Sequence, residues 1–189
     1  MFGTTAETAH LIAYTSRPLE VFIRRARHAD PRLNTTINAT VNGRVPRSPL
    51  DTLRVEAFEK EPVLHSWLHL QHFRSCGVLS HILWTSKFFG LDHGEFCLPS
   101  VAYAHEVELS EAPNAIPDEF DRVSIARLQH LLREDAFSPT DAMVMVDFMV
   151  RHGILTADSD FGFAEMSMRM HRRLPFGGER VDGSRGREG

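Results

Sequence analysis

The sequence predicts a mainly α fold in which paired helices form two lobes, preceded by a short N-terminal extension and followed by a disordered tail. From residue 50 to residue 174, apolar residues recur at intervals of three and four, which is the spacing of one helix face. Short segments rich in Gly, Pro and Asp interrupt this pattern, as loops between paired helices do. Hydrophobic residues make up 42% and charged residues 24% of the 189 residues, which is typical of a globular domain.

Residues 1–49 are predicted to lie outside the helical body. Ser16-Arg17-Pro18 is a helix start signal, and basic residues occupy the face opposite the apolar positions. The apolar positions of this helix are Leu19, Phe22, Ile23 and Ala26. The pattern indicates a short surface helix, with a basic docking helix for an acidic partner as the alternative. Residues 31–49 are rich in β-branched side chains and contain an Asn42-Gly43 turn signal, so they predict an arm or a small hairpin.

The helical body follows. We expect helices over residues 50–60, 63–76, 78–89, 98–107, 123–133, 139–151 and 163–174. The segment VSIARLQHLLREDAFSPTDAM, residues 123–143, is predicted to be the hinge of a helix-loop-helix pair, because a Ser-Pro start signal follows the first helix. Helices of this length do not persist alone in water, so their apolar faces are expected to pack together. Residues 175–189 are Gly-rich and charged, which predicts a disordered tail.

Several short stretches between Pro49 and His171 resemble the four-EF-hand proteins of the calmodulin, myosin light chain and troponin C type. They are Val55–Phe58, Phe73–Gly77, Gly94–Pro99, Glu108–Ala112, Val123–Leu132 and Phe137–Asp141. In that family the twelfth residue of each loop is a Glu that binds calcium through both oxygens. The resemblance implies an EF-hand-like lobe over residues 50–107 and a second over residues 108–174.

The loops depart from the family at the calcium ligands. Loop two would offer Phe89, Leu91, His93 and Ser100. Loop three would place Arg127 at the twelfth position, where a cation repels calcium. In loop four, Asp158 and Asp160 are weak metal candidates, but the twelfth position is Ser167. A register shifted by two puts Glu165 there instead, and neither register is complete. The resemblance therefore implies degenerate loops, with no metal and no cofactor.

The resemblance then implies a calcium-independent structural subunit rather than an enzyme. A groove between helix pairs would grip an amphipathic helix of a partner protein, and flexible Met side chains suit such a groove. The predicted partner-binding residues are Met143, Met145, Met149, Met166 and Met170, with core packing as the alternative. By family analogy, the chain would belong to a hetero-oligomeric cytoskeletal, axonemal or flagellar assembly.

Composition excludes several other classes. The formal net charge of −4 gives no basic footprint for nucleic acid. The N-terminus has no basic segment followed by an apolar one, which argues against a secretory signal, and no apolar run reaches the roughly 18 residues of a membrane helix. Two cysteines, Cys76 and Cys97, are too few for a disulfide framework. A reducing, cytoplasmic location is expected.

Three further interpretations remain open at this stage. His72, the His105-Glu106 pair and residues 116–118 resemble the spacing of HD-domain metal phosphohydrolases, although those enzymes use a His-Asp doublet. Residues 141–173 could form a winged helix, yet its recognition helix would be acidic and apolar. His65, His69 and His72 share one helix face and could hold zinc or iron, but no carboxylate lies nearby.

Overall fold

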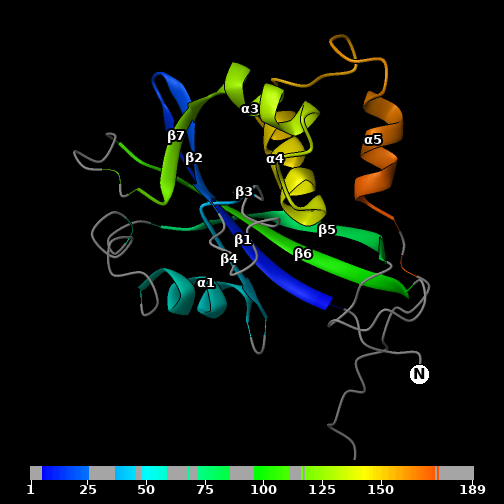
Figure 1. The fold of residues 1–189 in the computed structure, drawn as a ribbon, viewed down its shortest axis with the longest axis horizontal. Helices are drawn as coiled ribbons and strands as arrows, with labels where there is room; N and C mark the ends of the chain where they lie inside the picture. Colours follow the sequence, from blue (N-terminus) through cyan, green and yellow to red (C-terminus); the bar gives the residue numbers. More distant parts are fainter. Residues whose placement is uncertain are drawn as a thin grey trace, which may run out of the picture.

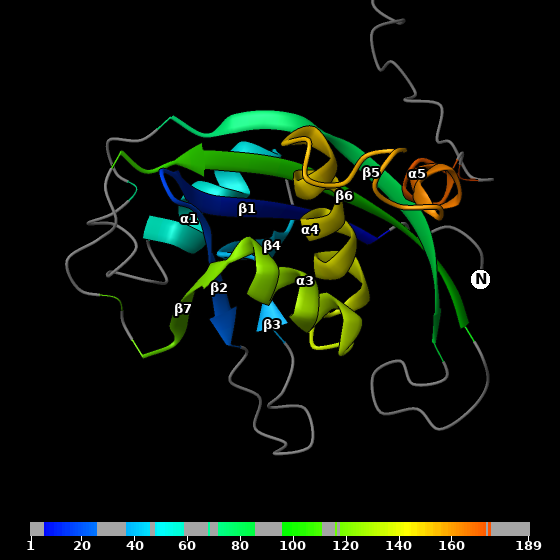
Figure 2. The same cartoon turned by 90° about the horizontal axis from the view of Figure 1, so that it is seen from above.

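The computed structural model describes residues 6–25, 37–45, 48–58, 68, 72–85, 96–110, 116, 118–172 and 174. A mixed sheet is the centre of the fold, with α1 on one face and α3 and α4 on the other (Figures 1 and 2). The strands are β1 (Ala6–Ser16), β2 (Leu19–Arg25), β3 (Ile37–Asn38), β4 (Val41–Arg44), β5 (Arg74–Thr85), β6 (Phe96–Glu108) and β7 (Phe120–Ser124). The helices are α1 (Pro49–Phe58), α3 (Ile125–Arg133), α4 (Pro139–Arg151) and α5 (Phe163–Met170).

β1 organises the sheet. The strand order is β3-β2-β1-β6-β5, with β4 beside β1 and β7 beside β2. β1 pairs with β6 in parallel from Ala6 opposite Ser100 to Tyr14 opposite Glu108. On its other edge β1 pairs antiparallel with β4 and then with β2. β1 therefore lies between strands that follow it closely in the sequence, β2 and β4, and the distant strand β6.

The predicted N-terminal helix is wrong, because residues 6–25 form the hairpin of β1 and β2 around a cis peptide bond between Arg17 and Pro18. In β1 the consecutive residues Leu11, Ile12 and Ala13 are all fully buried, since both faces of the sheet are covered. Such strands lose the alternation that marks a half-buried strand. Asn42 and Gly43, read as a turn, belong to β4.

The predicted helices over 78–89 and 98–107 are also wrong, because these residues belong largely to the long antiparallel pair β5 and β6. Apolar runs of this kind fit a buried strand as well as a buried helix, and their spacing does not decide between them. The expected helix over 63–76 falls mostly outside the described residues, and β5 already begins at Arg74. The predicted tail, 175–189, lies outside them entirely.

The other expected helices are confirmed as α1, α3, α4 and α5. Their starts carry local signals, because a Ser side chain accepts a hydrogen bond from a backbone N–H of the first turn in three of them. Ser48 accepts from Asp51, Ser124 from Arg127 and Ser138 from Asp141. The hinge at 123–143 thus contains two true helices, but Val123 and Ser124 end strand β7.

The mainly α fold class with two EF-hand-like lobes is therefore corrected to a mixed α/β fold. Strands from residues 6–16, 74–85 and 96–108 share one sheet, so paired helix-loop-helix lobes do not form. Within the residues that the structure places, no helix is long and apolar enough to cross a membrane.

Each face of the sheet carries its own hydrophobic core. The α4-side core includes Ile12, Leu79, Val144, Met145, Phe148 and Met149. The α1-side core includes Leu11, Phe22, Leu53, Ala57, Leu68 and Val107. Residues two apart in a strand share a face, so Ile12 and Leu11 serve different cores.

The edge of the sheet at β5 is partly covered by the chain that follows α5. Ser80 forms a parallel bridge with His171, and the Arg172 N–H donates to the Ser80 carbonyl at 3.3 Å. A β-bulge interrupts the pairing of β5 with β6 between Ser75 and Gly77, where Gly77 has a φ of 142°. Val78, next to the bulge, is 50% exposed.

A buried carboxylate fastens α4 to the sheet. Asp141 Oδ1 lies 3.0 Å from His10 Nδ1 and accepts from the Ala39 N–H at 3.1 Å. Its Oδ2 accepts from the Ser138 hydroxyl at 2.6 Å, and the Asn42 side chain donates to both oxygens at 3.4 Å. One residue of the first turn of α4 thereby joins β1, β4 and the residue after β3.

We expect Asp141→Asn to lower the free energy of unfolding by about 3 kcal/mol, because the amide leaves buried donors without an acceptor. Equilibrium urea unfolding measures the change. Asp158→Asn, in an exposed loop, is the control and should change stability by less than about 0.5 kcal/mol. A loss below about 1 kcal/mol for Asp141→Asn would contradict the anchoring role.

The same carboxylate predicts an acid-dependent loss of stability. Burial raises the pKa of Asp141, but hydrogen bonds from His10, Ser138 and the Ala39 N–H, together with attraction to His10, lower it below the ordinary 3.8. Its stabilising effect is complete above that ordinary value and is lost as the pH falls through the lower folded value. Unfolding measured between about pH 5 and pH 2 should show a steeper acid loss for the native chain than for Asp141→Asn.

Candidate functional site

Glu56 of α1 lies against strand β4. A Cβ atom added at Gly43 would be 2.6 Å from the Glu56 Cγ, so only glycine permits this close approach. Ala9 lies opposite Gly43 in β1 and Tyr103 opposite Ala9 in β6. On this face of the sheet, the two small residues Gly43 and Ala9 therefore lie between Glu56 and Tyr103.

Three more polar side chains occupy the same face of the sheet. The Tyr103 hydroxyl donates to Glu7 Oε2 at 3.2 Å. His105 is two residues beyond Tyr103, so it shares that face, and it is 6% exposed. We call Glu7, Glu56, Tyr103 and His105 the α1-face polar group.

His105 is the most constrained member of the group. Its Nδ1 is buried and has no hydrogen-bond partner among the residues that the structure describes. Burial lowers the pKa of His105, against a smaller opposing effect of its backbone hydrogen bond with Tyr103. The imidazole is therefore neutral at neutral pH and can accept a proton.

The α1-face polar group has the functional groups of acid–base chemistry. A carboxylate or a neutral imidazole can take a proton from water, and a phenol can orient a ligand oxygen. Among the described residues, no three His, Cys, Asp or Glu side chains gather as a metal ion requires.

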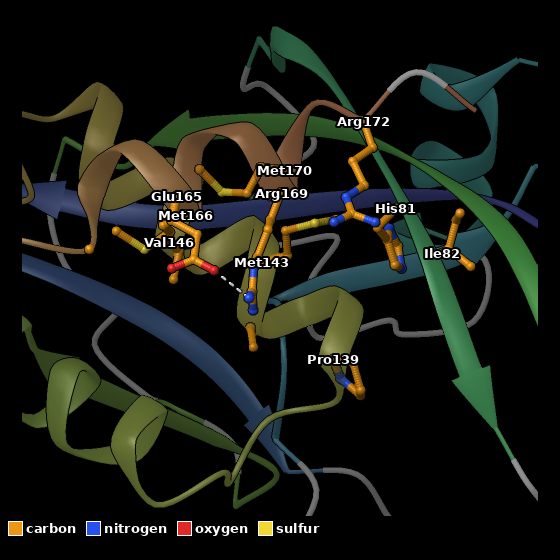
Figure 3. Close-up of a pocket in the computed structure, with 12 residues that line it drawn as sticks. His81, Ile82, Pro139, Met143, Val146, Glu165, Met166, Arg169, Met170 and Arg172 are labelled. Carbon is orange, nitrogen blue, oxygen red and sulfur yellow. Dashed lines mark hydrogen bonds and ion pairs between the residues drawn. The ribbon is translucent and has the colours of Figure 1, made fainter. Parts of the chain in front are cut away.

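A groove of about 660 Å³ lies on the opposite face of the sheet, between α4, α5 and β5 (Figure 3). Its lining residues are His81 and Ile82 of β5, Pro139, Ala142, Met143 and Val146 of α4, Gly162, Glu165, Met166, Arg169 and Met170 at α5, and Arg172. Arg169 and Glu165 form an ion pair within it. The groove combines an apolar wall with charged groups.

The predicted methionines divide between this groove and the core. Met143, Met166 and Met170 line the groove, so three of the five are brought together, and Met170 is also a member of the α4-side core at 4% exposure. Met145 and Met149 are 0% and 2% exposed in the α4-side core. Their assignment to a protein partner stays a prediction.

The weak metal candidates lie in the loop between α4 and α5 and in the first turn of α5. Asp158 and Asp160 are exposed in the loop before α5, where Asp160 Oδ1 accepts from the Gly162 N–H at 2.7 Å. Glu165 is in the first turn of α5 and pairs with Arg169. Asp160 and Glu165 are thus each engaged by a residue a few positions away in the chain.

A buried charge cluster around Glu106 was not predicted from the sequence. The Glu106 carboxylate is 1% exposed and pairs with Arg74, Arg151 and His152. Arg151 also donates to Asp147 Oδ2 at 2.7 Å. The only sequence signal was a Glu within an apolar run. This signal does not identify partners such as Arg151 and His152, which are distant in the chain.

The HD-type and winged-helix interpretations are both wrong. His105 lies on the α1 face of β6, whereas its neighbour Glu106 contacts Arg151 on the α4 face, so the pair cannot share a metal ion. Residues 156–162 form turns rather than the strands of a wing. The supposed recognition helix, α4, buries Val144 and Phe148 against the sheet.

Comparisons with known proteins identify the fold. Dihydroneopterin triphosphate pyrophosphohydrolase from E. coli matches with a TM-score of 0.54 at 9% identity, over 79% of this chain and 99% of that one. The NUDIX domain of NrtR from Shewanella oneidensis, in complex with ADP ribose, matches with a TM-score of 0.50 at 13% identity, over 82% of this chain and 91% of that one. The chain therefore has the mixed α/β fold of these proteins.

A sequence relative also exists. An uncharacterized protein of Saccharomyces cerevisiae is 30% identical over 136 residues. The alignment covers 67% of this chain but 39% of the yeast protein, so the chain spans less than half the length of that relative. No protein-family model matches the chain.

These comparisons correct the EF-hand resemblance, because the similar solved structures are a pyrophosphohydrolase and a NUDIX domain and not EF-hand proteins. The calcium-independent, cytoskeletal structural subunit and the absence of enzymatic activity were consequences of that resemblance. Both are corrected with it, since the fold is one that hydrolases use.

The burial of the methionines predicts unequal effects on stability. Met145→Ala should lower the free energy of unfolding by about 3 kcal/mol, because it leaves a cavity in the α4-side core. Met143→Ala, at the partly exposed groove wall, is the matched variant and should cost less than about 1 kcal/mol. Urea unfolding of both variants measures the difference, and equal losses would contradict this division.

Proposed function

We propose that this chain is a phosphohydrolase acting on a compound with two or more linked phosphates. The observation that carries the proposal is the shared fold with a pyrophosphohydrolase of dihydroneopterin triphosphate, at a TM-score of 0.54. A second protein of this fold is complexed with ADP ribose, at a TM-score of 0.50. Both ligands contain linked phosphates, which supports that substrate class.

The α1-face polar group is the proposed site of hydrolysis. Glu56 is a half-buried carboxylate held against the sheet by the close approach to Gly43, and a carboxylate in such a position can accept a proton. In the proposed step, a water oxygen attacks phosphorus and the bridging P–O bond breaks. The water proton passes to the Glu56 carboxylate, and the departing phosphate oxygen carries the negative charge.

The neighbouring groups would orient the reactants. The Tyr103 hydroxyl donates its proton to Glu7, so its oxygen can accept a hydrogen bond from the attacking water. Neutral His105 can accept a hydrogen bond without adding negative charge to the site. In a phosphoryl transfer most of the rate enhancement comes from such positioning and from stabilisation of charge.

Binding without hydrolysis is the second candidate. It is supported by the NUDIX domain of NrtR, which has the same fold and is complexed with ADP ribose. On this candidate the same face would hold the ligand without activating water.

The test is an assay of the purified chain with dihydroneopterin triphosphate and with ADP ribose, in the presence and absence of magnesium. We expect hydrolysis, and we expect Glu56→Gln to lower kcat by about a hundredfold or more, because the amide cannot accept the proton. Glu134→Gln, in an exposed pair with His130, is the matched control and should retain full activity.

The outcomes separate the two candidates. Saturable binding of either compound without product, measured by calorimetry, would favour the binding function. If neither compound is bound or cleaved, or if Glu56→Gln cleaves as fast as the native chain, the proposed hydrolysis at this face is wrong.

A further inference from the structure

The groove between α4, α5 and β5 has a polar end and an apolar wall. At the polar end, the Arg172 side chain reaches down beside the His81 ring (Figure 3). Along the wall, Met143 and Val146 of α4 face Met166 and Met170 of α5. Its volume of about 660 Å³ is within the range of sites for small molecules.

The charges of the groove do not cancel. Arg169 pairs with Glu165, so these two residues contribute no net charge. The Arg172 guanidinium makes no ion pair with any residue in the described part of the chain. Counting only residues placed in the structure, the groove therefore presents one guanidinium, that of Arg172, without a paired carboxylate.

His81 adds a directed polar group beside this charge. Its Nε2 is 3.3 Å from the Thr140 hydroxyl, whereas its Nδ1 is buried and lacks a partner among the residues placed in the structure. Burial, and the nearby His10, lower the pKa of His81. If the Thr140 hydroxyl donates to Nε2, the neutral ring carries its proton on Nδ1 and can donate it to a ligand oxygen.

We propose that this groove binds a small organic anion whose acid group contacts Arg172 and His81 and whose apolar body packs between Met143, Met166 and Met170. A carboxylate or phosphate matches the guanidinium in charge and geometry. Methionine side chains adapt to irregular apolar shapes, so they suit a flexible chain or a ring.

This site is separate from the proposed hydrolysis. The groove lies on the α4 face of the sheet, whereas Glu56 and Tyr103 lie on the α1 face. Ligand binding in the groove can therefore be measured without any turnover. Failure of either proposal leaves the other standing.

The test uses the full chain with carbon-13 in its methionine methyl groups. Octanoate, octyl phosphate and octan-1-ol are added in turn, and the methyl resonances are followed by NMR. We expect the two acids to shift the signals of Met143, Met166 and Met170. Met149 in the core and Met168, which is 68% exposed and outside the groove, are internal controls and should not move.

Variants test the recognition of the acid group. Arg172→Gln should weaken binding of both acids about tenfold or more, because a charge-assisted hydrogen bond is lost. It should leave the weak binding of octan-1-ol unchanged. Arg133→Gln, at an exposed position of α3, is the control and should bind the acids like the native chain.

Preference for one acid identifies the head group, and either preference supports the site. The proposal is overturned if neither acid shifts the groove methionines, or if the control methionines shift equally. It is also overturned if octan-1-ol binds as tightly as octanoate, or if Arg172→Gln binds octanoate as well as the native chain does.

Discussion

The buried carboxylate of Asp141 is the contact on which the α4 half of the structure depends. It receives hydrogen bonds from β1, from the residue after β3, from β4 and from its own helix cap. An acceptor surrounded by donors in this way offsets the cost of its own burial. Because Asp141 fixes the first turn of α4, the residues of its later turns that pack on the sheet are fixed as well. The core beneath α4 and the groove beside it both depend on this placement of the helix, because α4 residues line both.

Successive side chains of strand β6 point to opposite faces of the sheet, so its polar residues belong to two separate compartments. Tyr103 and His105 face α1, whereas Glu106 faces α4, where it pairs with two arginines and contacts the ring nitrogen of His152. Neighbouring residues in a strand point to opposite faces. The side chains of the neighbouring residues His105 and Glu106 therefore lie on opposite faces of the sheet and cannot act together. Each compartment has its own helix, its own core and its own polar groups.

The sequence was informative where a signal is local. Ser138 with Pro139 marks a helix start that the structure contains. The long strands β1 and β6 were not found because burial on both faces removes the period of two, as in Leu11, Ile12 and Ala13 of β1. Gly43 was read as a turn residue, although its role is to admit Glu56. Contacts such as His10 with Asp141 join residues 131 positions apart, and no local pattern in a single sequence reveals such a pair.

The outer strand β5 shows how the fold limits association between molecules. A free strand edge is a template on which a second sheet can grow, and natural proteins obstruct such edges. Here the backbone after α5 occupies the hydrogen-bonding positions at Ser80, and the bulge at Gly77 bends the strand a few residues away. Along this stretch the edge is neither straight nor fully open, so a strand of another molecule cannot pair with it readily. The exposed side chain of Val78 therefore does not lead to association through this edge.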